Sequence, residues 1–201
     1  MKKFELTAEF VTNVFGKKLF RIKALVAFGD VEKGELGGFI EKEDNLSHDG
    51  NAWVSGNAQV SGNAWVYGNA WVYGDAHVSG NAQVYGNARV SGDARVYGNA
   101  WVSGDAWVSG DAWVSGDAHV SDNARVSGNA DYAVVAGFGR YFRTTTFFRC
   151  KDKILRVQCG CFYGDLAQFR EIVKKTHGDS KYAKEYLAIA DLMELHFSDE
   201  C

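Results

Sequence analysis

The chain has 201 residues, of which 46% are hydrophobic, and 22 Lys+Arg against 25 Asp+Glu residues give a formal net charge of -3. This balance argues against nucleic acid as a general partner, which requires a strongly basic surface. Two glutamates fall in the first nine residues, where a signal peptide needs an apolar stretch, and no run approaches the roughly 20 apolar residues of a membrane span. We therefore expect a cytoplasmic protein with reduced thiols and no membrane partner.

The first segment, residues 1–37, predicts a β-hairpin. Residues 4–11 and 18–25 are rich in aromatic and branched aliphatic side chains, and the stretch between them contains turn residues from Asn13 to Gly16.

The middle of the chain is an internal repeat. Residues 50–127 hold 13 consecutive copies of Gly-(Asn/Asp)-Ala-x-Val-(Ser/Tyr), with Asp122 in place of one glycine. Ala and Val are two positions apart, so on an extended strand both point inward, while x and Ser/Tyr point outward. Gly followed by Asn or Asp suits the corner, because these residues tolerate a left-handed backbone. Two degenerate units precede the tract, with Ile40 and Leu46 in the Ala position, so the coil is expected to begin near Gly38.

This hexad resembles the left-handed β-helix of hexapeptide-repeat proteins, in which three hexads form one triangular coil. The left hand is implied by the resemblance alone, since ordinary parallel crossovers favour the opposite hand. A flatter coil of two hexads is the structural alternative. Unpaired strand edges at both ends of a solenoid require caps. We therefore predict a mainly β fold in which residues 1–37 form an N-terminal β-hairpin cap, residues 38–133 a left-handed parallel β-helix, and residues 134–201 a C-terminal α+β cap.

The C-terminal segment predicts a second hairpin and two helices. Residues 141–150 and 154–162 form the expected hairpin, which turns at residues 151–153. The first helix is expected over Leu166–His177, with Asp165 as N-cap and Gly178 as its stop. The second is expected over Lys181–His196, and much of its apolar stripe consists of Leu187, Ile189, Leu192 and Leu195.

Both flanks of the repeats are similar to uncharacterised hexapeptide-repeat proteins of bacteriophages and prophages. The similar segments are Leu36-Gly-Gly-Phe-Ile-Glu-Lys-Glu-Asp-Asn-Leu-Ser, Cys159-Gly-Cys-Phe and His177-Gly-Asp. This resemblance implies a protein made in the cytoplasm of a bacterial host, and it implies no mechanism.

All six tryptophans occupy the outward x position. A coil of three hexads would stack one face as Trp53, Trp71, Arg89, Trp107 and Arg125, with Arg89 between two indoles at a spacing that suits cation–π contact. The second face would carry Gln59, His77, Arg95 and Trp113, and the third Trp65, Gln83, Trp101 and His119. Trp and Arg are enriched at interface hot spots, so the expected binding residues are Trp53, Trp71, Arg89, Trp107, Arg125, Trp65, Trp101 and Trp113. The alternative is that the aromatic side chains only stack on one another and stabilise the sheets.

The leading hypothesis is a non-catalytic binding or scaffold protein that assembles as a homotrimer, as the resembled family does. Its further partner would be a host protein or a small nucleotide-like ligand, and antagonism of a host defence system is one version of this role. The alternative implied by the resemblance is an acyl-CoA-dependent acyltransferase with a histidine as general base. Its candidates, His77 and His119, are separated by seven hexads, which is not a multiple of three, and so fall on different faces. We predict no cofactor.

Two other features of the sequence bear on binding. The C-terminal hairpin carries basic and aromatic residues in the pattern of a single-strand nucleic-acid site, but we favour aromatic side chains that point inward and charges that point to solvent. These residues are Arg140, Arg143, Arg149, Lys151, Lys153, Arg156, Tyr141, Phe142, Phe147 and Phe148. The cysteines are Cys150, Cys159, Cys161 and Cys201, and two further ligands at suitable spacing are missing, so we predict no metal site.

Overall fold

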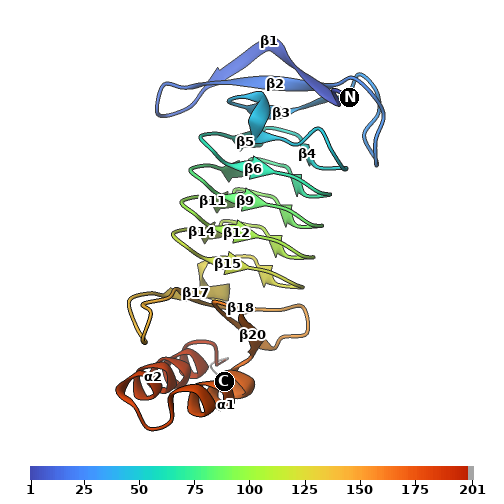
Figure 1. Cartoon of the computed structure of the whole chain (residues 1–201). Coiled ribbons are helices and arrows are strands. Elements are labelled where there is room, and N and C mark those ends of the chain that lie inside the picture. Colours follow the sequence, from blue (N-terminus) through green and yellow to red (C-terminus); the bar gives the residue numbers. More distant parts are fainter. Residues whose placement is uncertain (199–201) are drawn as a thin grey trace.

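The computed structural model describes residues 1–198, so the predicted C-terminal cap is described without its last three residues, one of which is Cys201. The middle of the chain is a parallel β-solenoid that stacks in one direction between two caps (Figure 1). Each strand takes up the x and Val positions of one hexad. The strands are β4 (Trp53–Val54), β5 (Gln59–Val60), β6 (Trp65–Val66), β7 (Trp71–Val72), β8 (His77–Val78), β9 (Gln83–Val84), β10 (Arg89–Val90), β11 (Arg95–Val96), β12 (Trp101–Val102), β13 (Trp107–Val108), β14 (Trp113–Val114), β15 (His119–Val120) and β16 (Arg125–Val126).

Strands three hexads apart pair in parallel and form three sheets, which we call faces 1, 2 and 3. Face 1 contains β4, β7, β10, β13 and β16, face 2 contains β5, β8, β11 and β14, and face 3 contains β6, β9, β12 and β15. Trp53 pairs with Trp71 and Arg89 with Trp107, so the register repeats every third hexad. The triangular coil is therefore confirmed, and the alternative of two hexads per coil is wrong.

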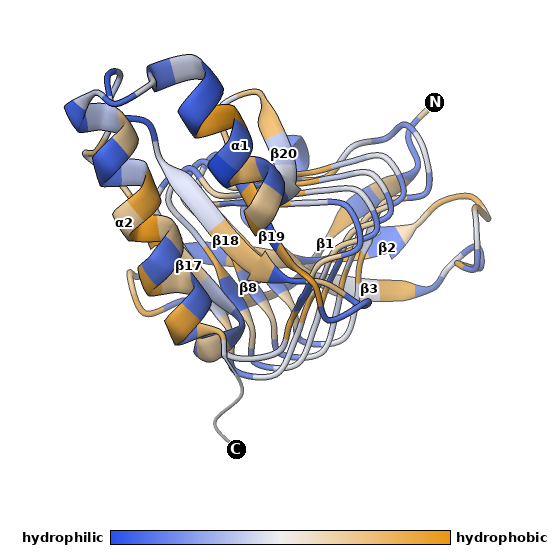
Figure 2. Ribbon diagram, turned by 90° about the horizontal axis from the view of Figure 1, so that it is seen from below, coloured by the Kyte–Doolittle hydropathy of each residue, from blue (hydrophilic) through white to orange (hydrophobic). Residues whose placement is uncertain are grey.

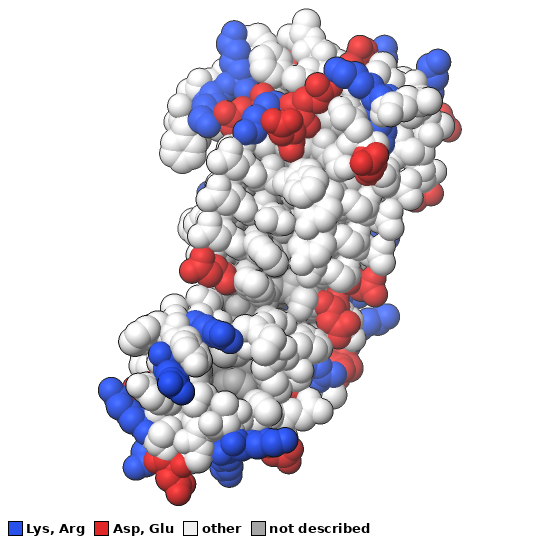
Figure 3. Space-filling model, viewed as in Figure 1, with Lys and Arg blue, Asp and Glu red and all other residues white. Residues whose placement is uncertain are grey.

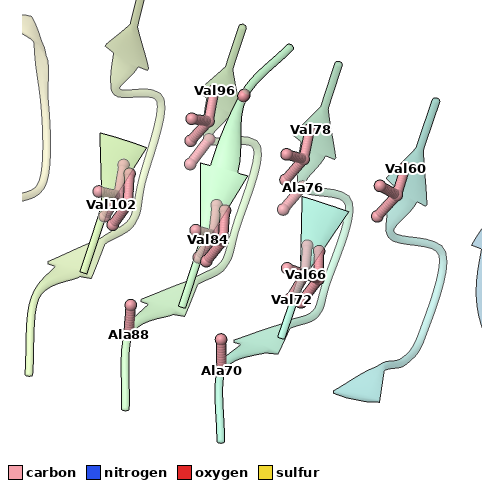
Figure 4. Packing of buried hydrophobic residues seen from close by; sticks show 14 of the residues in the cluster. Val60, Val66, Ala70, Val72, Ala76, Val78, Val84, Ala88, Val96 and Val102 are labelled. Atoms are coloured by element: carbon pink, nitrogen blue, oxygen red, sulfur yellow. The ribbon is translucent and has the colours of Figure 1, made fainter. Parts of the chain in front are cut away.

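The interior is a column of Ala and Val side chains. In the hexads from residue 52 to residue 126 every repeat Ala and Val is at most 1% exposed, and these side chains converge from strands of different sheets (Figure 4).

The backbone geometry at the corners of the coil explains why each hexad begins with glycine. Gly80 has φ +71, and a Cβ there would lie 2.9 Å from the backbone nitrogen of Gly98 in the next coil. Asp122, the one exception to the glycine position, takes the same left-handed conformation with φ 56.

The N-terminal hairpin is confirmed as β1 (Phe4–Thr12) and β2 (Lys18–Ala24), which pair antiparallel. Then β2 pairs with β3 (Leu36–Ile40), and β3 runs parallel to β5, so the hairpin extends face 2. A 3-10 turn, η1 (Glu43–Asn45), follows.

The expected position of the first two units is wrong. Ile40 pairs with Val60, and Leu46 bridges to Val66. Both residues therefore occupy the Val position and not the Ala position. The physical reason is size, because a long branched side chain fits the flat centre of a face better than the tight corner. A short insertion between Leu46 and Val54 absorbs the shift.

The C-terminal cap is a four-stranded antiparallel sheet with two helices. It begins with η2 (Asn129–Asp131) and contains β17 (Tyr132–Val135), β18 (Thr145–Arg149), β19 (Leu155–Cys159), β20 (Phe162–Asp165), α1 (Leu166–His177) and α2 (Lys181–His196). Seen from below, the helices lie across this sheet at the end of the solenoid (Figure 2). The predicted helices are confirmed, and Asp165 caps α1 by accepting a hydrogen bond from Gln168 N. The predicted hairpin is confirmed in part, since residues 141–144 lie outside β18 and two outer strands join it.

The predicted apolar stripe of α2 is only partly correct. Ile189 is buried, whereas Leu192 and Leu195 are 57% and 72% exposed. The buried positions are Ala183, Tyr186, Ile189, Ala190 and Met193. Small alanines let α2 approach its neighbours closely, and Tyr186 and Met193 fill the space between them. Among residues 1–198, no helix is long and apolar enough to cross a membrane, and no cluster of side chains suits a metal ion.

Candidate interaction surface

The expected ladders of outward residues are present. On face 1, Trp53, Trp71, Arg89, Trp107 and Arg125 follow one another in register. Face 2 carries Gln59, His77, Arg95 and Trp113. Face 3 carries Trp65, Gln83, Trp101 and His119.

Trp53 is a correction to the predicted binding set. It occupies the outward position, but it is 0% exposed and belongs to the core. Phe28, from the N-terminal segment, packs edge-on against it with ring centroids 5.4 Å apart. The segment that follows β2 therefore covers the first rung of face 1, and the exposed ladder begins at Trp71.

An open groove of about 690 Å³ lies on face 1 beside this covered rung. Its lining includes Trp71, Tyr73 and Arg89, with Gly29 and Asp30 of the N-terminal segment. Arg89 lies in register between two tryptophans, but the expected cation–π contacts are absent. Among the described residues its guanidinium has no hydrogen bond, ion pair or ring contact. The groove therefore offers an unpaired guanidinium beside an indole and a phenol.

The lower rungs of face 1 are tied to the solenoid. The Arg125 guanidinium lies 5.7 Å from the Trp107 ring, and its Nη1 donates a hydrogen bond to the Asp105 carbonyl at 3.0 Å. Trp107 Nε1 donates to Ser91 Oγ at 3.1 Å. These contacts hold the two side chains against the surface.

Face 3 carries a continuous aromatic ladder. Trp65 stacks on Tyr67 at 4.1 Å, and Tyr67 stacks on Tyr85 at 4.9 Å with an interplanar angle of 5°. Tyr85 meets Trp101 edge-on, and Trp101 stacks on His119 at 4.9 Å. We call this set the face 3 ladder.

No outward position of face 3 holds Lys, Arg, Asp or Glu; its other outward residues are Gln83, Ser103 and Ser121. Tyr67 Oη donates a hydrogen bond to Gln83 Oε1 at 3.2 Å. Burial lowers the pKa of His119, which keeps its ring neutral at neutral pH. In Figure 3 the side of the solenoid that faces the viewer is accordingly white over most of its length between the caps, which means that few Lys, Arg, Asp or Glu side chains lie there.

Face 2 has a smaller cluster. The Arg95 guanidinium lies 5.0 Å from the ring of Trp113, which is 45% exposed. His77 lies on this face, while His119 lies on face 3, so the two candidate general bases share no site. Burial first, and then the charge of Arg95, lowers the pKa of His77.

The N-terminal wall of the groove was missed from the sequence. The available signal was Phe28-Gly29-Asp30, an aromatic residue directly before a turn in the connection between β2 and β3. Of the aromatic residues expected to point inward in the C-terminal hairpin, Phe147 and Phe148 are buried, but Tyr141 and Phe142 are 63% and 72% exposed.

The fold and its outward ladders define a β-solenoid repeat protein with aromatic faces. A family model described as YdcK Beta solenoid repeat matches residues 58–74, 64–80, 82–98, 88–104 and 94–110. All five matches lie within the solenoid, so the likeness covers the repeats and neither cap. No curated protein matches the chain.

Proposed function

We propose that this chain is a non-catalytic binding and scaffold protein that self-associates as a homotrimer through face 3. The observation that carries this proposal is the face 3 ladder, which is aromatic and contains no charged side chain. Trp65 and Trp101 are 43% and 38% exposed. A Trp side chain can bury roughly 150–250 Å², and soluble monomers rarely expose contiguous apolar patches above a few hundred Å².

Face 3 is better suited to self-contact than the other faces. Burying it between copies removes no charge from water, whereas faces 1 and 2 would desolvate Arg89, Arg125 or Arg95. Interface cores are depleted in charged residues and enriched in aromatic ones. Because the repeat is regular, the face 3 ladders of three parallel copies can lie around one common axis over their whole length.

Face 1 then remains for a further partner. The unpaired Arg89 guanidinium can bind an anionic group, and Trp71 and Tyr73 offer rings for stacking. A nucleotide-like ligand or an acidic, aromatic segment of a host protein has this chemistry. The resemblance of the flanking segments to phage and prophage proteins supports a role in an infected bacterium, where antagonism of a host defence is one use of such capture.

We further infer a left-handed coil. The support is the likeness of the hexad, with its Gly-Asn corners and its period of three hexads, to left-handed hexapeptide-repeat proteins. An experimental density map of the chain would give the hand directly, and a right-handed coil would separate this protein from that group.

The test uses two matched double variants. Trp65→Ser with Trp101→Ser alters face 3, and Trp71→Ser with Trp107→Ser alters the equivalent rungs of face 1. Light scattering should give three times the mass of one chain for the wild type and the face 1 variant, and one chain mass for the face 3 variant. Circular dichroism checks that the solenoid persists. A monomeric wild type, or a trimeric face 3 variant, would contradict the assembly.

Two further measurements address partner capture and catalysis. A pull-down from host lysate should lose its partner in the face 1 double variant while the trimer persists. Acetyl-CoA should leave the thermal midpoint unchanged, because only a ligand that binds the folded state raises it. A saturable rise would favour the acyltransferase alternative.

A further inference from the structure

The C-terminal cap has a small, half-open cavity whose lining residues are separate from the solenoid faces. Its volume is about 190 Å³, and it lies between the loop after β17, the β19–β20 turn and both helices. The lining brings together two segments that stand apart in the sequence: Cys159 and Cys161 come from Cys-Gly-Cys-Phe, and His177 comes from the end of α1. Both belong to the flanking segments named in the sequence analysis, and neither takes part in the contacts proposed for faces 1 and 3.

A strained loop covers the cavity and presents basic side chains to it. Gly139 has φ +72, and a Cβ there would collide with the Tyr186 hydroxyl. Gly139 N donates a hydrogen bond to Glu185 Oε2 at 2.9 Å, which ties the loop to α2. Phe142, with φ 52, adopts the left-handed region that bulky residues avoid. Such conformations persist only where the surroundings impose them, and they are frequent at ligand sites.

The polar side of the cavity is basic. Arg140 and Arg143 line it, and both guanidiniums lie over the Tyr141 ring, at 5.5 and 5.2 Å from its centroid. Within the described part of the chain neither forms an ion pair, and no Asp or Glu lines the cavity. A side chain at Gly160 would meet the Arg143 guanidinium, so the glycine lets Arg143 lie across the β19–β20 turn.

The other side of the cavity is apolar, with one buried hydroxyl. Phe162, Phe169, Ile172 and Val173 line this side. Tyr186 is 6% exposed, and burial, followed by the neighbouring Cys159, raises its pKa to about 12. The phenol therefore keeps its proton at neutral pH and can donate a hydrogen bond to an anion.

We propose that this cavity binds a small organic anion, with a carboxylate or phosphate group held by Arg140, Arg143 and the Tyr186 hydroxyl and an apolar body against Phe162, Phe169 and Val173. With about 190 Å³ the cavity has room for a single ring or a short chain. Charge-assisted hydrogen bonds from arginine are the strong, directional contacts for such a head group. All residues that line the cavity belong to the C-terminal cap, and Arg143 also lines a second pocket with Asp117 and His119 at the end of face 3.

The experiment is calorimetric titration of the full chain with phenyl phosphate and benzoate, which separate the two head groups. Benzyl alcohol lacks the charge, and inorganic phosphate lacks the apolar body. We expect saturable one-to-one binding of phenyl phosphate or benzoate, at least about tenfold tighter than either control. Binding of neither anion, or equal binding of benzyl alcohol, overturns the proposal.

Three variants locate the site. Arg143→Gln should weaken binding about tenfold or more, by the loss of a charged hydrogen bond. Lys151→Gln, at the opposite end of the β18–β19 hairpin, removes the same charge and should change affinity less than about twofold. Equal losses in the two variants would indicate a general charge effect and overturn the site.

Ile172→Trp keeps the net charge, and Ile172 is 38% exposed, so the fold tolerates a larger side chain there. It should block binding, and unchanged affinity would place the anion elsewhere.

Discussion

Phe28 packs edge-on against the indole of Trp53, with the two ring planes inclined by 74°. Trp53 stands in the same repeat position as Trp71, which remains half-buried on the next coil. The N-terminal segment therefore turns one rung of a surface ladder into core. The first coil is closed by side chains as well as by the added strands of the hairpin.

We predict that Phe28→Ala destabilises this end of the solenoid by about 1–3 kcal/mol, because an aromatic contact is lost and an indole becomes exposed. Urea unfolding measures the loss. Exchange of the Trp53 indole N–H, followed by NMR, should also become faster. The matched control is Phe15→Ala in the β1–β2 turn, where the side chain is 84% exposed and the change should stay within about 0.5 kcal/mol. Similar losses for both variants would mean that Phe28 does not seal the first coil.

A second closing device is a buried lysine. Lys3 Nζ donates hydrogen bonds to the carbonyl oxygens of Gly50 and Ala52, at 3.3 and 2.8 Å. One coil further on, the equivalent carbonyls accept from the backbone N–H groups of Asn51 and Trp53. One ammonium group thus replaces the two backbone donors that the first coil lacks. Asn45 does the same at another corner, where its Nδ2 donates to Gly62 O and Ala64 O.

The shifted pKa of Lys3 makes the free energy of unfolding depend on pH in a predictable direction. Burial lowers the pKa of Lys3 from its usual 10.5 to about 8. Between these two values the unfolded chain binds more protons than the folded one, so the contribution of Lys3 to the free energy of unfolding rises with pH. Below the lower value the ammonium is charged in both states, and its desolvation cost is fully present.

The measurement is the difference in unfolding free energy between wild type and Lys3→Met across that pH window. We expect the variant to be less stable, by about 1–3 kcal/mol for two unpaired carbonyls, and the gap to widen as pH rises. Subtraction removes the opposite dependence of Cys150, whose raised pKa of about 11 reflects burial. Lys23→Met, at an exposed position of β2, should show no such change. A gap that narrows with pH would contradict the assigned protonation.

Repetition made the solenoid and its ladders predictable. The order of residues within each hexad determines which side chains point inward and which point outward. The strand partners of Arg89 therefore follow from counting three hexads in either direction. The burial of Trp53 does not follow in this way, because it depends on where Phe28 folds, in a segment without a repeat. The first units also differ, since Ile40 fits the repeat only after a shift of register that nothing local marks.

The C-terminal cap shows the same limit. Capping residues located α1 and α2 correctly, but the α2 sequence offers two overlapping apolar stripes. The stripe that contains Ala183 and Tyr186 is buried, and Leu195 is exposed to solvent. The reason is that close approach of the helices favours small residues. His177 and Cys159 meet at one cavity only through the packing of helices on the sheet, which sequence spacing cannot report.

The corners of the solenoid carry a ladder of amides that distinguishes Asn from Asp. Asn69 Nδ2 donates to Asn87 Oδ1 at 3.1 Å, and Asn87 Nδ2 donates to Asp105 Oδ1 at 2.9 Å. An ionised Asp accepts but cannot donate, so each ladder of this kind ends at its first Asp. At the corner before face 2, Asp75, Asp93 and Asp111 follow one another on successive coils, about 4.8 Å apart. Three like charges therefore stand where amides would bond.

We predict that Asp93→Asn raises the free energy of unfolding by about 0.5–1 kcal/mol, because it removes repulsion and supplies a donor to its neighbour. The reverse change, Asn87→Asp, places a carboxylate against Asp105 and should lower it by a similar amount. Both effects should shrink in high salt, which screens exposed charges, whereas a salt-independent change would point to altered backbone geometry. If Asp93→Asn instead destabilises the chain, repulsion between the three carboxylates is not the dominant effect at this corner.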